Sequence, residues 1–337
     1  MCLISADLAF IHLSDIHFRR GRAGDVHDED QVLRNELQLD LRRLRTRLSR
    51  LDGLIISGDV AFGGKAEEFE YAARWIETVR ELVGCLTDAV MVIPGNHDVD
   101  RAFVQQDDDV HQLQKEIREA AAFPGYDDRL ANILRDDARG TALLGPLDAY
   151  NVLAREYNCQ IDRTRPFWER DFPLRDNSKL RIRGISTTFL SGVDDDPPMM
   201  GKMLYGGAQR AILREPNVRY AIVGHHPPSW SLEGDTADQV FSTFASLQIF
   251  GHKHEQWVTR IGESVRMIAG AVHPPRNEIN WQPRYAAVAI TEVDEKTLWL
   301  RIYPRRWSTE EAKFIGDFNS EGHDYRDYRV AVEPRQA

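Results

Sequence analysis

The amino-acid sequence predicts an α/β fold, and three observations support this prediction. Apolar runs of strand length end abruptly in Asp, Asn or His at five places in the chain. Segments with apolar residues at helical spacing separate the first three of these runs, which is the pattern of β-α-β units. Beyond residue 255, short apolar runs separated by turn residues indicate antiparallel hairpins.

The first hundred residues alternate strand and helix patterns. Strands are expected to begin near Leu8, Leu54 and Ala89, and amphipathic helices are expected over residues 33–51 and 66–82. Because β-α-β crossovers are right-handed, the three strands should be largely parallel. Their polar ends, at Asp15, Asp59 and Asn96, should therefore lie at one edge of the sheet.

The remaining chain divides into an insertion, a second group of strands and a tail. Residues 101–179 contain acidic runs and amphipathic pieces, which predict a mostly helical insertion that caps the site or decorates a remote surface. Further elements are expected at 180–188 (strand), 206–213 (short helix), and 256–260, 264–269, 284–293 and 297–303 (hairpin strands). We therefore expect one domain over 1–304, with its insertion at 101–179, and a partly docked tail over 305–337.

Composition limits the class of protein. The chain has 337 residues, 42% of them hydrophobic, so it can bury a large core. Its formal net charge of −10 gives no global attraction to nucleic acid or anionic membranes. The apolar runs stay well short of the ~20 residues that a membrane span needs, so we expect a soluble protein with no membrane partner. The three cysteines, Cys2, Cys85 and Cys159, form no CxxC motif and fit a cytoplasmic location.

Several arginines lie between the leucines of the first predicted helix, including Arg34, Arg42 and Arg45. They offer a local basic surface for nucleic acid, but nearby acidic residues favour a solvated face of a packed helix.

The polar residues at the five strand ends predict a single metal site. Taken one at a time, each residue also fits a turn, a helix cap or a surface position. Five coincident strand ends are harder to explain in that way. The polar residues are Asp15, His17, Asp59, Asn96, His97, Asp98, His225, His226, His252 and His254.

The donor atoms indicate which metals such a site would hold. Carboxylate, amide and imidazole groups without thiolates suit divalent manganese, iron, zinc or nickel, and manganese is our first expectation. The set exceeds what one ion needs, and Asp59 can bridge. We therefore expect two divalent ions about 3.5–4 Å apart, which suggests phosphate-ester chemistry.

These blocks, taken in order, resemble the calcineurin-like metallophosphoesterase superfamily. The motifs are DIH at 15–17, GD at 58–59, GNHD at 95–98, GHH at 224–226 and GHKH at 251–254. The resemblance covers residues 9–303 and implies a four-layer α/β/β/α sandwich. It further implies one metal held by Asp15, His17 and His254, a second held by Asn96, His225 and His252, and Asp59 bridging the two.

The resemblance also implies a mechanism, in which a hydroxide bridging the metals attacks phosphorus. His97 would be the general acid at the leaving oxygen, with Asp98 orienting its ring. The alternatives are that His97 is an additional ligand and Asp98 a turn cap. His226 can replace His225 as ligand or contact substrate. Other residues beside the motifs that can pair with a phosphate oxygen are Arg19, Arg20, Arg101 and Lys253.

Four functions fit this sequence. The leading hypothesis is a phosphodiesterase acting on a nucleotide-like small molecule or another small phosphoester. A nuclease acting on DNA or RNA is an alternative, although the acidic insertion argues against a basic channel. A protein phosphatase is less favoured because the insertion would crowd a flat substrate. The alternative from another class is a non-catalytic scaffold, which is disfavoured because every expected ligand is present.

Overall fold

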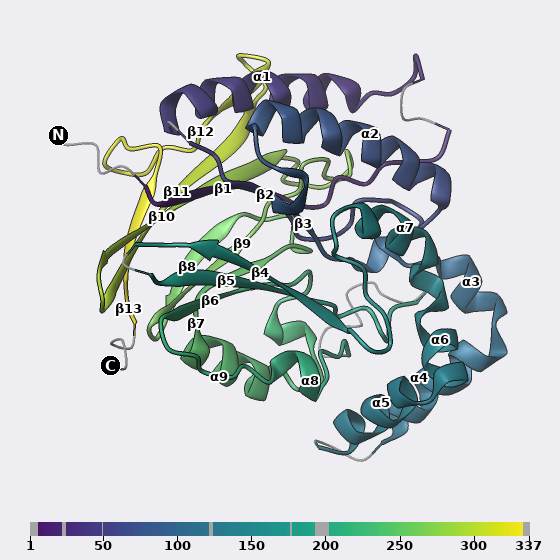
Figure 1. Ribbon diagram of the computed structural model, residues 1–337. Helices are drawn as coiled ribbons and strands as arrows, with labels where there is room; N and C mark the ends of the chain where they lie inside the picture. The colour runs from purple at the N-terminus through teal and green to yellow at the C-terminus, as the bar shows by residue number, and fades with distance from the viewer. Residues whose placement is uncertain are drawn as a thin grey trace.

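Two β-sheets stack between two layers of helices (Figure 1). The computed structural model describes residues 6–21, 25–48, 50–120, 124–175, 177–192 and 202–332. Helices α1 (Gln31–Leu48) and α2 (Ala66–Val83) cover the outer face of one sheet, and α8 (Gly207–Arg210) and α9 (Gly234–Phe244) that of the other. This arrangement confirms the predicted four-layer α/β/β/α sandwich.

The first sheet has the strand order β12-β11-β10-β1-β2-β3, and β13 also pairs with β11. Its strands are β1 (Leu8–Leu13), β2 (Gly53–Ile56), β3 (Val90–Val92), β10 (Arg284–Asp294), β11 (Thr297–Ser308), β12 (Lys313–Gly316) and β13 (Arg326–Ala331). Strands β1, β2 and β3 are parallel, as predicted, and buried along their whole length. Helices cover one face and the second sheet the other, which explains their continuous apolar sequence.

Helix α1 shows how the sequence pattern produces this packing. Its leucines at helical spacing, Leu33, Leu37, Leu41, Leu44 and Leu48, are all buried. Arg34 departs from the expected solvated face because it is buried and pairs with Asp28.

None of the helices in the described part of the chain combines the length and the apolar sequence that a membrane span needs.

The second sheet has the order β4-β5-β6-β7-β9-β8. Its strands are β4 (Phe167–Pro173), β5 (Lys179–Ile185), β6 (Val218–Val223), β7 (Ala245–Phe250), β8 (Trp257–Ile261) and β9 (Ser264–Ile268). Strands β5, β6, β7 and β9 run parallel. The two predicted hairpins, β8–β9 and β10–β11, both form, but they belong to different sheets.

The predicted insertion is helical only in its first part. Five helices occupy it: α3 (Arg101–Gln106), α4 (Asp108–Glu119), α5 (Gly125–Arg135), α6 (Asp137–Leu144) and α7 (Asp148–Glu156). The segment that follows forms β4, which pairs with β5 over seven residues. Trp168 of β4 is buried and donates its indole N–H to Val92 O at 2.8 Å. The insertion, which was expected to end at 179, therefore ends before β4, because β4 is a strand of the second sheet.

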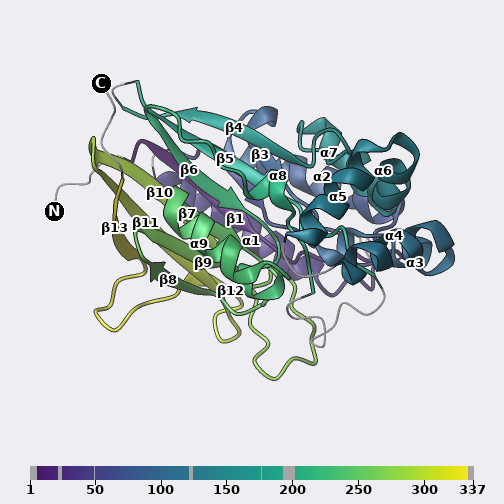
Figure 2. The ribbon, with the colours of Figure 1, turned by 90° about the horizontal axis from the view of Figure 1, so that it is seen from below.

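These five helices gather at one end of the sheets (Figure 2). The Tyr150 hydroxyl donates to Val92 O at 3.1 Å, at the carboxyl end of β3. The Gln114 amide donates to Ser191 O at 2.9 Å, in the loop after β5. The helical segment therefore contacts the last residue of β3 and the loop after β5, at the end of the sheets where ligand sites form. Its effect on substrate choice stays a prediction.

Four short 3-10 helices complete the described elements. They are η1 (Thr87–Ala89), η2 (Asn96–Asp98), η3 (Gly145–Leu147) and η5 (Pro228–Trp230). Helix η2 lies within the GNHD motif, and η5 begins shortly after GHH, so the chain turns tightly at these two strand ends.

The boundary expected at 304 falls inside a strand. Strand β11 continues through it to Ser308, and β12 and β13 both pair with β11. Arg305, the first residue of the expected tail, is buried and donates two hydrogen bonds to Asp40 of α1, at 2.7 and 2.8 Å. Tyr285 donates a third to the same carboxylate at 2.6 Å.

The Asp40 carboxylate is therefore expected to matter for stability. Asp40→Ala removes the carboxylate that accepts both hydrogen bonds of the buried Arg305 and leaves it only the more distant Asp324, at 3.8 Å. We expect this change to lower the free energy of unfolding by about 3 kcal/mol. Urea unfolding followed by circular dichroism measures this change. Glu70→Ala, on the exposed face of α2, is the control and should stay within about 0.5 kcal/mol. Equal stability of the two variants would contradict the assignment.

Candidate metal centre

The carboxyl ends of five strands meet where the two sheets face each other. Strands β1, β2 and β3 bring residues of the first sheet, and β6 and β7 bring residues of the second. Groups of His and acidic side chains here have ligand atoms within 4.8 Å of one another. The members of these groups are Asp15, His17, Asp59, His97, His225, His226, His252 and His254. The structure thus brings together side chains separated by more than 200 residues of sequence.

The backbone at these positions is unusual. Asp15, His17, Asp59, His252 and His254 all have positive φ, between 52° and 72°. Such conformations are costly outside glycine and cluster at functional sites. Hydrogen bonds between the loops hold them, including Asp15 N to Gly58 O at 3.1 Å and His17 N to Asp59 O at 3.0 Å. Each loop therefore fixes the conformation of its neighbour.

Gly95 allows the third loop to approach the second. A Cβ atom added there would lie 2.1 Å from Asp59 Oδ1 and 2.6 Å from Asp59 N. We expect Gly95→Ala to displace the Asp59 carboxylate and to reduce bound metal to less than half, measured by elemental analysis of the purified protein. Gly63→Ala is the matched control, because its Cβ meets nothing closer than 3.7 Å. Equal metal content in the two variants would contradict this role.

One cluster forms around Asp15. His254 Nε2 lies 3.4 Å from Asp15 Oδ1, and His17 Nε2 lies 4.0 Å from the same oxygen. His17 Nε2 is also 3.9 Å from Asp59 Oδ2. His254 turns its other nitrogen, Nδ1, toward Glu278 Oε1 at 2.5 Å. A carboxylate behind a histidine in this way is typical of metal ligands.

A second cluster forms around the other side of Asp59. His225 Nε2 lies 3.3 Å from Asp59 Oδ2, and its Nδ1 donates to Ser57 O at 2.8 Å. The ligand atoms of His225, His226 and His252 lie within 4.8 Å of one another. Asp59 Oδ2 thus lies within 4 Å of a histidine of each cluster, and the bridging role that the resemblance implies for Asp59 stays a prediction.

His226 keeps the alternative ligand assignment open. Its Nδ1 lies 2.6 Å from the Thr187 hydroxyl, and its Nε2 is buried without a hydrogen-bond partner. His225 Nε2 is likewise buried without one. Either member of the pair therefore presents a nitrogen that a cation can use.

The unpartnered atoms of the site test whether metal ions fit. Asp15 Oδ1, Asn96 Oδ1 and His225 Nε2 are buried and form no hydrogen bond. Buried polar atoms without partners are rare and costly, so several in one place need a common explanation. Oxygen and imidazole nitrogen donors in this number fit two divalent cations.

Protonation of these groups also fits cation binding. Burial lowers the pKa of His17 and of His252 to about 3, which keeps both imidazoles neutral. Burial opposes protonation of His225 and His254 as well, but the Asp59 and Asp15 carboxylates outweigh it and raise their pKa values to about 9 and about 10. Divalent cations displace such protons when they bind.

His97 lies beside the clusters and is half-buried. Its backbone N–H donates to Asp59 Oδ1 at 2.8 Å, and its ring centre is 4.6 Å from that of His17. The ring Nδ1 donates to Phe62 O at 2.8 Å, which leaves Nε2 as the nitrogen available to a substrate or a cation. Both interpretations of His97, general acid and additional ligand, are compatible with this position.

Asp98 does not orient His97, and this part of the prediction is wrong. Its carboxylate is fully buried and accepts hydrogen bonds from Ala61 N at 2.7 Å and Gly95 N at 2.9 Å. It thus joins the second and third loops, as the turn-cap alternative expected. Burial, with Asp59 nearby, raises the pKa of Asp98 to about 7. The Phe62 carbonyl takes the orienting role instead.

Arg19 and Arg20 differ in their surroundings. The Arg19 guanidinium lies over the Phe62 ring at 3.9 Å from its centre, and Arg19 lines a cavity together with His17. Arg20 is largely exposed and pairs with Glu67 at 2.9 Å. Arg19 is therefore the better placed of the two to meet a phosphate group.

The other two predicted substrate residues lie on separate elements. Arg101 begins α3, and its Nε is buried without a hydrogen-bond partner. Lys253 is exposed between two candidate ligands and lies 5.7 Å from the centre of the Trp257 ring. The structure gives neither a direct contact with the clusters.

Sequence reasoning missed three residues of this region. Glu278 and Thr187 hold histidine rings of the site, and His273 contacts the first ligand loop from behind. His273 had a detectable signal, because it follows the short apolar run after β9 and precedes two prolines. The other two stand in segments without any metal-ligand pattern.

The fold and this group of candidate metal ligands match one protein family when the chain is compared with known proteins. Residues 8–256 match the model of the calcineurin-like phosphoesterase family. The chain therefore belongs to this family. It is 24% identical over 262 residues to the uncharacterized metallophosphoesterase-like protein YydB of Bacillus subtilis. That match covers 73% of this chain and 48% of YydB, so the chain spans about half the length of this relative.

Solved structures that match this fold include Vps29 of Entamoeba histolytica and GAP50 of Plasmodium. Vps29 of Entamoeba histolytica, in complex with zinc, matches with 12% identity and a TM-score of 0.37, over 96% of this chain and 99% of Vps29. GAP50 of Plasmodium matches with 9% identity and a TM-score of 0.45, over 98% of this chain and 90% of the GAP50 chain.

Proposed function

We propose that this protein is a phosphodiesterase that uses two divalent metal ions to hydrolyse a nucleotide-like small molecule, with His97 as general acid. The observation that carries this proposal is the pair of ligand clusters that share the Asp59 carboxylate. A carboxylate close to both clusters can hold two ions near each other, as the chemistry of a two-metal hydrolase needs.

The two clusters would each hold one metal ion in this proposal. Asp15, His17 and His254 would hold one ion, and Asn96, His252 and one of His225 or His226 the other. Bound divalent ions would supply Lewis-acid activation of water and neutralise charge on the phosphate.

The residues around the ions handle the leaving group and the phosphate. The Phe62 carbonyl fixes His97 with Nδ1 protonated, so Nε2 is the atom that would hold the proton for the leaving oxygen. Arg19 would pair with a non-bridging phosphate oxygen.

Hydrolysis of two chromogenic esters tests the proposal. We expect the protein with added manganese to hydrolyse bis-p-nitrophenyl phosphate faster than p-nitrophenyl phosphate, and a chelator to abolish both reactions. The same pair should be assayed with zinc, nickel and iron, because availability decides which ion fills such a site. Faster hydrolysis of the monoester would reject the diester preference. If neither ester is hydrolysed with any of these metals, the proposal that the protein is a phosphoesterase is rejected, and a non-catalytic scaffold is favoured.

A further inference from the structure

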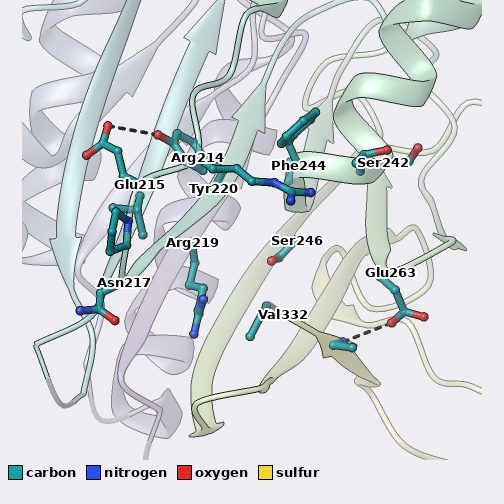
Figure 3. Close-up of a pocket in the computed structure, with 15 residues that line it drawn as sticks. Arg214, Glu215, Asn217, Arg219, Tyr220, Ser242, Phe244, Ser246, Glu263 and Val332 are labelled. Atoms are coloured by element: carbon teal, nitrogen blue, oxygen red, sulfur yellow. Dashed lines mark hydrogen bonds between the residues drawn. The ribbon is translucent and has the colours of Figure 1, made fainter. Parts of the chain in front are cut away.

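Two cavities of the described residues lie at opposite ends of the sheets. The larger, of about 640 Å³, opens where β6 and β7 begin, away from the candidate metal centre (Figure 3). Arg214 in this cavity lies over the Phe244 ring at 4.8 Å. Arg214 and Arg219 are balanced by Glu215 and Glu263 in the lining, so the cavity favours neither sign of charge in a ligand.

The smaller cavity, of about 320 Å³, adjoins the candidate metal centre. His17 and Arg19 line one side, and His273 lines another. Residues 28–30 and 274–277 supply most of the remaining wall. Any ligand of this cavity therefore lies next to a predicted metal ligand.

His273 presents a hydrogen-bond acceptor there. Its side chain is 5% exposed, and its Nδ1 contacts Ile16 O at 2.5 Å. A carbonyl oxygen only accepts, so Nδ1 must carry the proton and Nε2 must have a lone pair. This Nε2 is buried and has no hydrogen-bond partner. A buried acceptor of this kind needs a donor from a ligand or a water molecule.

His17 presents a matching donor. Its Nε2 faces Asp15 and Asp59, so that nitrogen is the one placed to bind a cation. A neutral imidazole that binds through Nε2 carries its proton on Nδ1. The Nδ1 atom is buried without a partner, although metal-binding histidines almost always donate this proton to something.

Arg19 presents the cavity's unpaired cation. The other two arginines of the lining are neutralised, since Arg34 pairs with Asp28 and Arg276 with Asp30 at 3.2 Å. Arg19 stacks on Phe62 and forms no ion pair with a described residue. Glu29 adds a carboxylate to the lining, so the formal charges of this cavity also balance. What distinguishes it is one buried acceptor, one buried donor and the Arg19 cation beside the candidate metal centre.

We propose that this cavity binds the sugar of the substrate, with a hydroxyl that donates to His273 Nε2 and accepts from His17 Nδ1, while Arg19 pairs with the phosphate. This subsite rests on the proposed function. It makes His273 a residue that selects diesters carrying a hydroxylated group over purely aromatic ones, whereas Arg19 binds the phosphate that both kinds of diester carry.

The test compares two diesters that share a leaving group. The p-nitrophenyl ester of thymidine 5′-phosphate carries a sugar hydroxyl, and bis-p-nitrophenyl phosphate carries none. His273→Asn keeps a side-chain amide N–H that can donate to Ile16 O and removes the ring atom Nε2, the proposed acceptor. We expect the ratio of kcat/KM for the thymidine ester to that for the aromatic diester to fall about tenfold, through KM.

Two further variants control this comparison. His323→Asn, at an exposed histidine paired with Glu321, should leave the ratio at the wild-type value. Arg19→Gln should raise KM for both diesters by a similar factor, because both carry the phosphate. Metal content of His273→Asn should equal that of the wild type, since a merely structural role would lower it.

The outcomes separate this subsite from the proposed function. If wild type hydrolyses both diesters and His273→Asn leaves their ratio unchanged, the subsite is rejected and the function stands. If wild type hydrolyses neither, the function is rejected, and calorimetry with thymidine 5′-phosphate decides the subsite. Weaker binding to His273→Asn than to wild type would then support it, and equal binding or none would overturn it.

Discussion

Asp59→Asn is expected to abolish diester hydrolysis, with a loss on the order of 10³-fold or more in kcat. The substitution keeps the size of the side chain and an oxygen that can accept from His97 N. It removes the negative charge that lies between the two clusters, 3.3 Å from His225 and 3.9 Å from His17. Metal ions supply several kcal/mol of transition-state stabilisation, and about 1.4 kcal/mol corresponds to tenfold in rate.

Metal content separates this explanation from misfolding. Elemental analysis of Asp59→Asn should find at most one ion per chain where the wild type binds two. Asp88→Asn, at an exposed position in η1, should match the wild type in both activity and metal content. An Asp59→Asn protein that retains two ions and full activity would exclude the bridging role.

His97→Asn is expected to reduce kcat by about 10²- to 10⁴-fold for a diester with a poor leaving group. The asparagine amide can still donate to Phe62 O, but the variant lacks the Nε2 atom that would protonate the leaving oxygen. The loss should be much smaller with p-nitrophenolate, which departs readily without a proton. Steady-state kinetics on a p-nitrophenyl diester and on a dinucleotide measures the difference.

The alternative role of His97 has a different signature. If His97 is an additional metal ligand, His97→Asn should lower kcat by the same factor for both substrates, and the amount of bound metal should decrease. His323→Asn again serves as the control, because it removes a histidine remote in sequence from every motif. Full metal content, together with a loss of kcat that is larger for the poor leaving group, would support His97 as the general acid.

The strands and their polar ends were predictable because local physics decides them. Strands β1, β2 and β3 are buried on both faces, so their sequences are continuous apolar runs that are easily recognised. Parallel pairing then places the residues after each strand at one edge. Asp15, Asp59 and His225 could therefore be assigned to one site before any coordinates were known.

The roles of Asp98 and Phe62 could not be predicted in the same way. Adjacent residues do not necessarily share a contact, and the Asp98 carboxylate turns toward Ala61 and Gly95 instead of the neighbouring ring. A backbone carbonyl such as that of Phe62 carries no sequence signal. Strand β4 was assigned to the helical insertion because its alternation is interrupted by charged residues on an exposed edge of the sheet.

The strand order of the first sheet also decides when the site can assemble. Strand β1 lies between β2 and β10, and Leu8 pairs with Ile290. During synthesis, this central strand waits for a partner that lies 282 residues further along the chain. A nascent chain that has not yet produced β6 carries the carboxylates and the amide but none of the second sheet's histidines. Binding of the expected metal ions would therefore follow synthesis of β6 and β7, and bound metal would report that both sheets have closed.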